Sequence, residues 1–182
     1  METIRTLRRT PIALPGEGRF LGVEQHAVEF PSGVVIDDWM WVITPEFVNI
    51  LPRMQDGRYL CYRQAKYAAD GLTLGVPGGY LEPGEAPLAA AQRELLEETG
   101  CTATGWIPLG AYVVDGNRGS GRGHFFLATG VEYRQPINAD DLEDLEPILL
   151  TRHELEAALL KGEFQVMPWT ACIALALLHE QE

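Results

Sequence analysis

Cysteine and basic residues are scarce in this sequence, and it contains no long hydrophobic run. The three cysteines (Cys61, Cys101 and Cys172) are widely spaced and form no CxxC pair, which argues against a disulfide framework and predicts reduced core residues. The four histidines show no zinc-ligand spacing. Lys and Arg number 14 against 26 Asp and Glu, giving a formal net charge of −12. Nucleic-acid backbone is bound by clustered basic residues, so we expect no nucleic-acid partner.

Export and membrane signals are also missing. The N-terminus is basic around Arg5, Arg8 and Arg9, but no apolar signal core follows. The apolar run at 172–178 is far too short to cross a bilayer. We therefore expect a cytoplasmic protein that does not associate with membranes. A phosphate substrate is still compatible with the negative charge, because bound divalent cations can reverse the local potential.

A length of 182 residues suits one domain with a small added sheet. Residues up to about 18 look like an arm or an irregular lead-in. Partial alternation at 20–30 and the apolar run at 34–43, joined by Pro31-Ser32-Gly33, predict a small antiparallel sheet. We accordingly predict an N-terminal arm and sheet over residues 1–45 and a main domain over 46–182.

In the main domain, strands and helices are mixed, which predicts an α/β layered fold. Residues 115–123, DGNRGSGRG, contain too many glycines for a regular element and are predicted to form a loop. Thr151 and Glu154 have the spacing of a capping box and predict a helix that Gly162 ends. A last helix is expected from about 168 to 179. The strands are predicted at 47–51, 58–64, 72–76, 106–114, 124–133 and 147–150.

The most informative segment is residues 79–101, GYLEPGEAPLAAAQRELLEETGC. It begins as a glycine-rich turn and continues as a helix, on which Glu94, Glu97 and Glu98 are spaced i, i+3 and i+4 and so share one face. Leu88 and Leu95 fall on an adjacent face that can pack on a core. A row of glutamates alone is more often a solvated helix face. If these carboxylates do bind an ion, oxygen donors favour a hard cation, Mg²⁺ or Mn²⁺.

The whole spacing of this segment is much more specific than its three glutamates. With average residue frequencies, a chance match of all its defined positions in a chain of this size has a probability on the order of 10⁻⁷. The segment resembles the box of the Nudix hydrolase family, with Cys101 as a mild departure from the more usual Ile, Leu or Val. The matching positions are Gly79, Glu85, Arg93, Glu94, Leu95, Glu97, Glu98, Gly100 and Cys101.

This resemblance implies a Nudix α/β/α sandwich with a small N-terminal antiparallel β-sheet extension. The added strands, the Arg63-Gln64 pair and the C-terminal layout look most like the ADP-ribose pyrophosphatase and nucleotide-sugar branch. In that branch the extra sheet commonly helps to build a dimer, so a homodimer is expected. Two departures weaken the assignment to ADP-ribose itself, because that branch usually has Glu at the position of Gly75 and Pro at that of Asn117.

The resemblance also implies roles for individual residues. The metal ligands would be Glu94, Glu97 and Glu98, often joined by the carbonyl of the residue matching Gly78. A general base is expected in the acidic stretch 140–146, with Glu143 the first candidate and Glu146 the second; the alternative reading of this stretch is a solvated acidic loop. Residues expected to support the site are Gly79, Glu85 and Arg93.

Substrate contacts are expected from arginine, whose fork geometry suits a diphosphate. Arg63 stands beside a strand end, and Arg118 and Arg122 lie in the glycine-rich segment; each is also compatible with an ordinary surface role. Trp39 and Trp41 could stack on a base, although aromatic residues at strand spacing are more often core or interface.

The leading functional hypothesis is a metal-dependent pyrophosphohydrolase that cleaves a nucleoside diphosphate linked to a group X, with ADP-ribose or a nucleotide sugar favoured. The alternative is a catalytically silent Nudix-fold nucleotide sensor or binding module. Such domains typically lose their metal-binding glutamates, whereas this sequence keeps them all. Isoprenoid diphosphate isomerisation, known in related folds, lacks support because no His/Cys metal arrangement is present.

Overall fold

The computed structural model describes residues 3–14, 20–136 and 145–181. By its contacts the chain divides into two compact units. The first unit is Met1–Glu46 together with Tyr112–Arg122, and the second is Phe47–Ala111 together with Gly123–Glu182. The predicted division at residue 45 falls near the first boundary, but it did not anticipate that residues 112–122 join the N-terminal strands.

The first unit is built on three antiparallel strands, β1 (Arg5–Ile12), β2 (Gly22–Glu29) and β3 (Val35–Ile43). The prediction of an irregular conformation was therefore wrong for residues 5–12. Strand β1 is almost entirely exposed and shows no apolar alternation, so its conformation comes from backbone pairing with β2 over the whole strand.

The tip of a long hairpin completes this unit. Strands β8 (Gly105–Asp115) and β9 (Gly119–Tyr133) pair with each other, and Val42 of β3 pairs in parallel with Gly119. The predicted loop at 115–123 is thus largely wrong, because only 116–118 connect the two strands. Gly119 has φ +80°, and a Cβ there would lie 2.5 Å from the Trp41 ring, so this glycine permits close packing within a strand.

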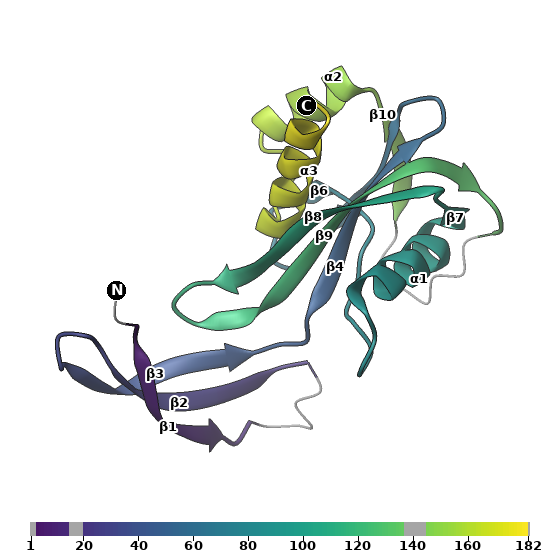
Figure 1. Cartoon of the computed structure of the whole chain (residues 1–182). Helices are drawn as coiled ribbons and strands as arrows, with labels where there is room; N and C mark the ends of the chain where they lie inside the picture. Colours follow the sequence, from purple (N-terminus) through teal and green to yellow (C-terminus); the bar gives the residue numbers. More distant parts are fainter. Residues whose placement is uncertain (1–2, 15–19, 137–144, 182) are drawn as a thin grey trace. The chain divides into compact units, whose positions relative to one another are not determined.

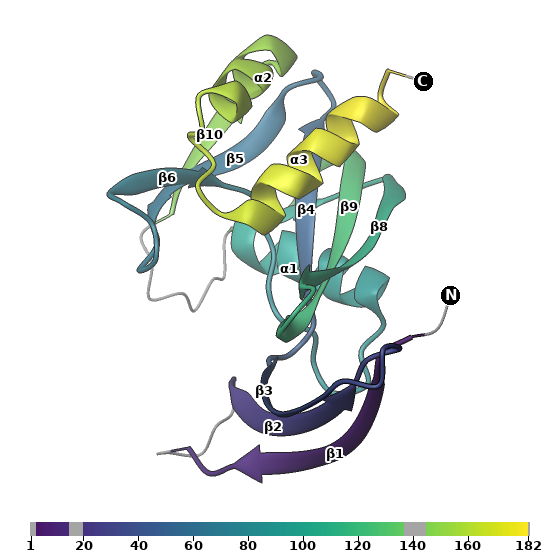
Figure 2. The same cartoon turned by 90° about the vertical axis from the view of Figure 1, so that its left-hand side faces the viewer.

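The second unit has a mixed sheet with helices on both faces (Figures 1 and 2). Strand β9 pairs in parallel with β4 (Phe47–Met54), and β4 is antiparallel to β5 (Tyr59–Ala65). Strand β5 pairs with both β6 (Leu72–Gly75) and β10 (Glu146–Leu150), and the short β7 (Cys101–Thr102) pairs with β9.

Alternation along β4 separates two apolar cores. Val48 and Ile50 pack on the face covered by α1 (Pro87–Thr99), whereas Leu51 packs on the opposite face. That opposite face is covered by α2 (Arg152–Leu160) and α3 (Met167–His179). This is the predicted α/β/α layering. The predicted capping box also forms, with Thr151 Oγ1 accepting from Glu154 N and Thr151 N donating to the Glu154 carboxylate.

The end of α3 is tied to the sheet by the carboxylate of Glu180, which is only 8 % exposed. It accepts hydrogen bonds from Arg53 Nη1, from the Tyr59 hydroxyl and from Arg152 Nη1. Burial, followed by the hydrogen bond to Glu180, raises the pKa of Tyr59 to about 12. All three cysteines are buried with free thiols. Among the described residues, no helix has the length and apolarity needed to cross a membrane.

Tyr59 should make stability sensitive to alkaline pH. An unfolded tyrosine releases its proton near pH 10, whereas folded Tyr59 keeps its proton until about pH 12. Its contribution to folding is therefore fully present below about pH 10 and is lost as pH rises towards 12. We expect the urea midpoint to fall less steeply over this range in Tyr59→Phe than in the wild type. Tyr67→Phe, at a fully exposed position, should behave as the wild type; equal slopes in all three proteins would contradict this account.

Candidate active site

Helix α1 carries the three glutamates, and its packing determines which way they point. Pro87 stands in the first turn, where its missing N–H is not needed, and Gly100 ends the helix with φ +67°. Ala90, Ala91 and Leu95 are buried against the sheet. Leu88, which the sequence placed on the core side with Leu95, is 42 % exposed, so that prediction was wrong.

The segment before α1 is held against β4 by backbone hydrogen bonds. Ile50 N donates to Pro77 O and Val48 N donates to Gly79 O, both at 2.9 Å. This leaves no room for side chains at either glycine. A Cβ on Gly78 would lie 2.1 Å from Val48 O, and one on Gly79 would lie 2.3 Å from Glu94 Oε1. The glycine pair is therefore required by close approach to a strand on one side and to a carboxylate on the other.

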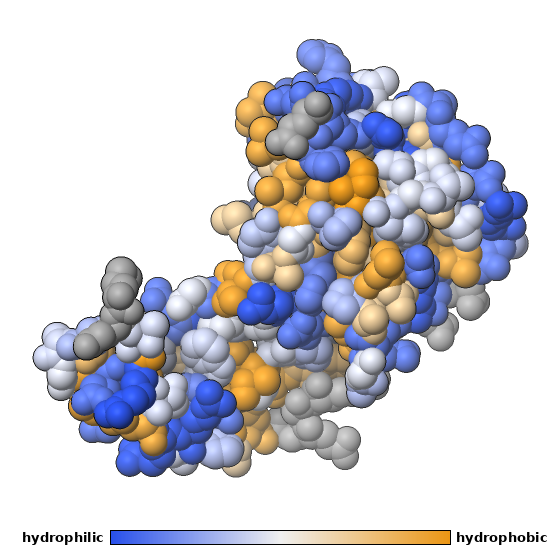
Figure 3. Space-filling view, viewed as in Figure 1, coloured by the Kyte–Doolittle hydropathy of each residue, from blue (hydrophilic) through white to orange (hydrophobic). Residues whose placement is uncertain are grey.

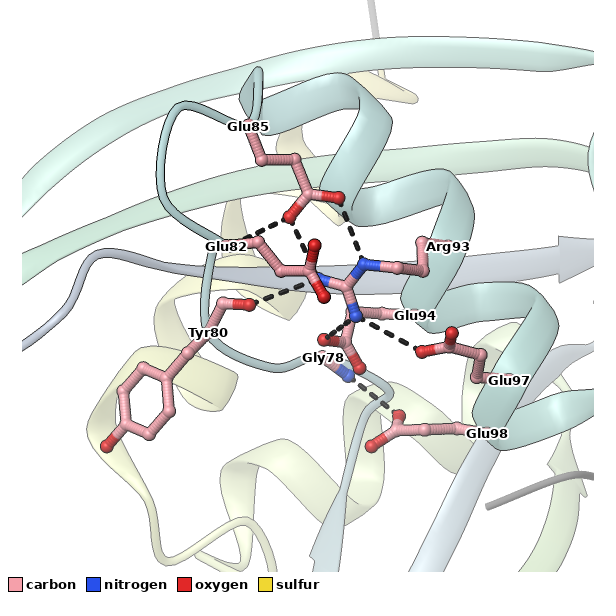
Figure 4. A network of polar contacts seen from close by, with 8 residues as sticks. All are labelled: Gly78, Tyr80, Glu82, Glu85, Arg93, Glu94, Glu97 and Glu98. Atoms are coloured by element: carbon pink, nitrogen blue, oxygen red, sulfur yellow. Dashed lines mark hydrogen bonds and ion pairs between the residues drawn. The ribbon is translucent and has the colours of Figure 1, made fainter. Parts of the chain in front are cut away.

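Arg93 stands at the centre of the carboxylates (Figure 4). Its Nε and Nη2 each donate to the Glu85 carboxylate at 2.9 Å, and Nη2 also donates to Tyr80 O at 3.1 Å. Its Nη1 donates to Glu94 Oε1 at 2.7 Å and to Glu97 Oε2 at 3.1 Å. These contacts use all five N–H donors of a guanidinium group. Arg93 therefore links the loop to the helix and draws two box glutamates towards one point.

The electrostatics of this group favour full ionisation of the Arg93–Glu85 pair. The hydrogen bonds to Glu85, then the one to Glu94, raise the pKa of Arg93 further above its already high ordinary value. The side-chain hydrogen bond from Arg93, followed by a backbone hydrogen bond from Glu82 N, lowers the pKa of Glu85. Glu85 is thus a charged brace between the turn at Glu82 and the middle of α1.

Glu98 is positioned separately from the Arg93 network. Its Oε2 accepts a hydrogen bond from Gly78 N at 2.9 Å, so the carboxylate points back at the glycine turn. The structure therefore brings together seven of the predicted site residues in the second unit. They are Gly78, Gly79, Glu85, Arg93, Glu94, Glu97 and Glu98.

The donor set suits a hard divalent cation. Glu94 and Glu97 converge on a single nitrogen of Arg93, which demonstrates that their oxygens can share one positive charge. Glu97 is 48 % exposed and Glu94 is 12 % exposed, so the pair runs from solvent into the protein. In the described ranges no three acidic, histidine or cysteine side chains already converge as a preformed ion site. The all-oxygen chemistry fits Mg²⁺ or Mn²⁺, and side-chain adjustment would complete the shell.

The other predicted residues are not among these seven. Arg63 is half exposed on β5, and its Nη1 lies 3.7 Å from Glu146 Oε2 on the paired strand β10. Arg118 and Arg122 belong to the first unit. Glu143 lies outside the described residues, so its predicted role as general base has no structural description.

The first unit contains an aromatic cavity that the sequence only hinted at. The cavity has a volume of about 420 Å³, and both Trp39 and Trp41 line it. The His26 ring stacks on Trp41 with centroids 5.5 Å apart, and Trp39 Nε1 donates to Asn117 O at 2.6 Å. The alternation of Trp39 and Trp41 along β3 was the available signal, whereas the contribution of Asn117 required knowledge of the hairpin.

Comparison with known proteins agrees with this geometry. The NUDIX domain model matches residues 44–170. An ADP-ribose pyrophosphatase from Bacillus subtilis (strain 168) is 26 % identical over 136 residues, which cover 73 % of each chain. A solved structure described as that of an ADP compounds hydrolase superposes with a TM-score of 0.81 at 22 % identity, covering 100 % of this chain and 96 % of the other, so the predicted fold class is confirmed. The family match spans well over half of the sequence and includes the whole glutamate helix, and on that basis the chain belongs to the Nudix family and is a Nudix hydrolase.

Proposed function

We propose that this Nudix hydrolase is a metal-dependent pyrophosphohydrolase that cleaves a nucleoside diphosphate linked to a group X. The observation that carries the proposal is the grouping of four carboxylates around one guanidinium and one glycine turn. Negative charge remains in excess there, which favours recruitment of a cation and, through it, of a phosphate substrate. ADP-ribose or a nucleotide sugar is the favoured substrate, since the relative from Bacillus subtilis is named an ADP-ribose pyrophosphatase.

In this proposal Glu94, Glu97, Glu98 and the Gly78 carbonyl hold Mg²⁺ or Mn²⁺. When bound, the cation supplies positive charge at the phosphoanhydride and makes water a stronger nucleophile. Arg93 and Glu85 keep the glutamates aimed at the site. Loss of such supporting contacts typically costs about 10–100-fold in metal affinity or activity.

Substrate and proton-transfer roles complete the proposal. Arg63 is a candidate for the diphosphate because its ion pair with Glu146 is long and exposed, and such pairs contribute little energy that would hold the guanidinium in place. Arg118 and Arg122 are proposed to contact the phosphate or the sugar. Glu143 remains the proposed general base on the strength of its position in the sequence.

A substrate panel tests the activity. Purified protein with Mg²⁺ or Mn²⁺ should hydrolyse at least one compound among ADP-ribose, nucleotide sugars and dinucleoside diphosphates. The products should be a nucleoside monophosphate and phosphorylated X, identified by chromatography and mass spectrometry. Turnover should disappear with EDTA and return with added cation. Folded protein that binds nucleotides without hydrolysing any of them would instead favour the sensor hypothesis.

We also propose that the first unit forms a homodimer contact. Its strands expose many apolar side chains, and Figure 3 shows apolar patches among polar ones over these strands. An interface with a second copy would cover such side chains; sedimentation showing only monomers at micromolar concentration would contradict it. The exposed large apolar residues among the described residues of this unit are Ile4, Leu7, Phe20, Leu21, Val34, Val35, Met40, Ile43, Tyr112, Val113 and Val114. We also propose a cytoplasmic location.

A further inference from the structure

Tyr62 is a buried residue of β5 whose hydroxyl reaches the end of the glutamate helix. It is 2 % exposed, and its hydroxyl donates to the backbone carbonyl of Glu98 at 2.9 Å. The last carbonyls of any α-helix lack partners within the helix. In α1, Leu96 O accepts a hydrogen bond from Gly100 N. Glu98 O accepts one from the Tyr62 hydroxyl, which comes from another element, strand β5.

Glu98 is consequently held by hydrogen bonds at both its backbone and its side-chain carboxylate. Its backbone carbonyl is held by Tyr62, and its carboxylate accepts from Gly78 N at 2.9 Å. Both anchors come from one part of the sheet. Tyr62 pairs in register with Gly75 of β6, and the chain runs from Gly75 through only two residues to Gly78. A displacement of β5 relative to α1 would therefore change the angle at which this carboxylate meets the glycine turn.

We propose that Tyr62 is a positioning residue for Glu98 and thereby for divalent-cation binding. This inference rests on the proposed function, because it takes Glu98 to be a metal ligand. The hydroxyl is the part that matters, since the ring alone would still pack in place. Without the hydroxyl the Glu98 carbonyl loses a buried donor, and the last turn of α1 gains freedom to move in search of another.

Strand β5 supplies a matched control for this experiment. Tyr59 is also 2 % exposed, and its hydroxyl also donates to a glutamate near the end of a helix, but that glutamate is Glu180 after α3. Tyr59→Phe and Tyr62→Phe therefore each remove one hydroxyl and its part-buried hydrogen bond from the same strand, to a carboxylate in the first case and to a backbone carbonyl in the second. They differ in whether the hydrogen bond leads to the proposed metal site.

The measurement is Mn²⁺ binding by electron paramagnetic resonance, with urea unfolding as the measure of stability. We expect both variants to lower the urea midpoint, Tyr59→Phe by the larger amount because its hydroxyl donates to a carboxylate. Only Tyr62→Phe should weaken Mn²⁺ affinity, by about 10-fold, and raise the Mn²⁺ concentration needed for half-maximal turnover in proportion. Sucrose in all samples keeps a weakened variant folded. Equal Mn²⁺ affinity in the two variants would overturn the role of Tyr62.

A third variant separates this inference from the proposed function. Glu98→Gln removes the carboxylate that the proposal assigns to the metal. If Mn²⁺ affinity does not change in Glu98→Gln, the metal site itself is wrong and the role of Tyr62 fails with it. If Glu98→Gln weakens binding and Tyr62→Phe matches Tyr59→Phe, the metal site stands and only the positioning role is overturned.

Discussion

Glu98→Gln is expected to lower turnover by roughly 100-fold or more. Loss of a residue that only supports a metal ligand typically costs about 10–100-fold, so loss of a ligand should cost at least the upper end of that range. Glutamine has nearly the same shape, so it can still accept the hydrogen bond from Gly78 N. It lacks the negative charge with which the carboxylate would hold the cation as charge develops on the phosphoanhydride. Glu97→Gln should act in the same direction. The measurement is kcat and kcat/KM at saturating Mg²⁺, with folding followed by circular dichroism.

The control for these variants is Glu156→Gln. Glu156 forms an i, i+4 ion pair with Arg152 on α2, is 40 % exposed and has no part in the proposed site. The Glu156→Gln variant loses one negative charge from a helix, as Glu97→Gln and Glu98→Gln do. Because exposed ion pairs contribute little energy, turnover in this variant should stay within about 2-fold of the wild type. Undiminished turnover in both Glu97→Gln and Glu98→Gln would refute the assignment of metal ligands.

Gly78→Ala should damage both folding and metal binding. A Cβ at this position would lie 2.1 Å from Val48 O and 3.0 Å from Asn49 Cα, so the turn must move away from β4. That movement strains the hydrogen bonds from Val48 N and Ile50 N and the one from Gly78 N to Glu98. We expect a loss of about 2–3 kcal/mol in unfolding free energy, in the range for overpacked sites, together with weaker Mn²⁺ binding.

Gly57→Ala distinguishes the steric clash from the general cost of replacing a turn glycine. Gly57 lies in the turn between β4 and β5, with φ +87° and open space where a Cβ would stand. Its replacement should therefore cost only the left-handed backbone penalty of about 1–2 kcal/mol and leave Mn²⁺ affinity unchanged. Urea unfolding and Mn²⁺ titration of both variants provide the comparison. If Gly78→Ala binds Mn²⁺ as tightly as Gly57→Ala does, the close approach of the turn to β4 has no bearing on the site.

The parts of this protein that could be predicted from sequence are those encoded over short distances. Helix α1 follows from apolar spacing and from Gly100, and the grouping of Glu94, Glu97 and Glu98 follows from helical periodicity. The capping box at Thr151 is equally local. In these cases the partners stand within about one helical turn of each other, so the sequence alone specifies the contact.

The failures concern contacts between distant segments. Strand β1 has no apolar pattern of its own and exists because β2 pairs with it. Gly119 looked like a loop glycine, yet it belongs to a strand. Because Gly119 has no side chain, it accommodates the ring of Trp41, which stands 78 residues earlier in the sequence. The hydrogen bond from Tyr62 to Glu98 spans 36 residues and has no signature in the sequence. Long-range pairing of this kind depends on the assembled fold, which local propensity does not reveal.

The hairpin of β8 and β9 determines how this protein can be divided experimentally. Residues 112–122 at its tip belong to the first unit, although the rest of the hairpin belongs to the second. Deleting residues 1–46 alone would leave Gly119, at that tip, without its strand partner Val42 and without the Trp41 ring that packs on it. A fragment that contains the second unit alone therefore has to omit two separate stretches of sequence, including Arg118 and Arg122, and rejoin residues 111 and 123 through a new short turn.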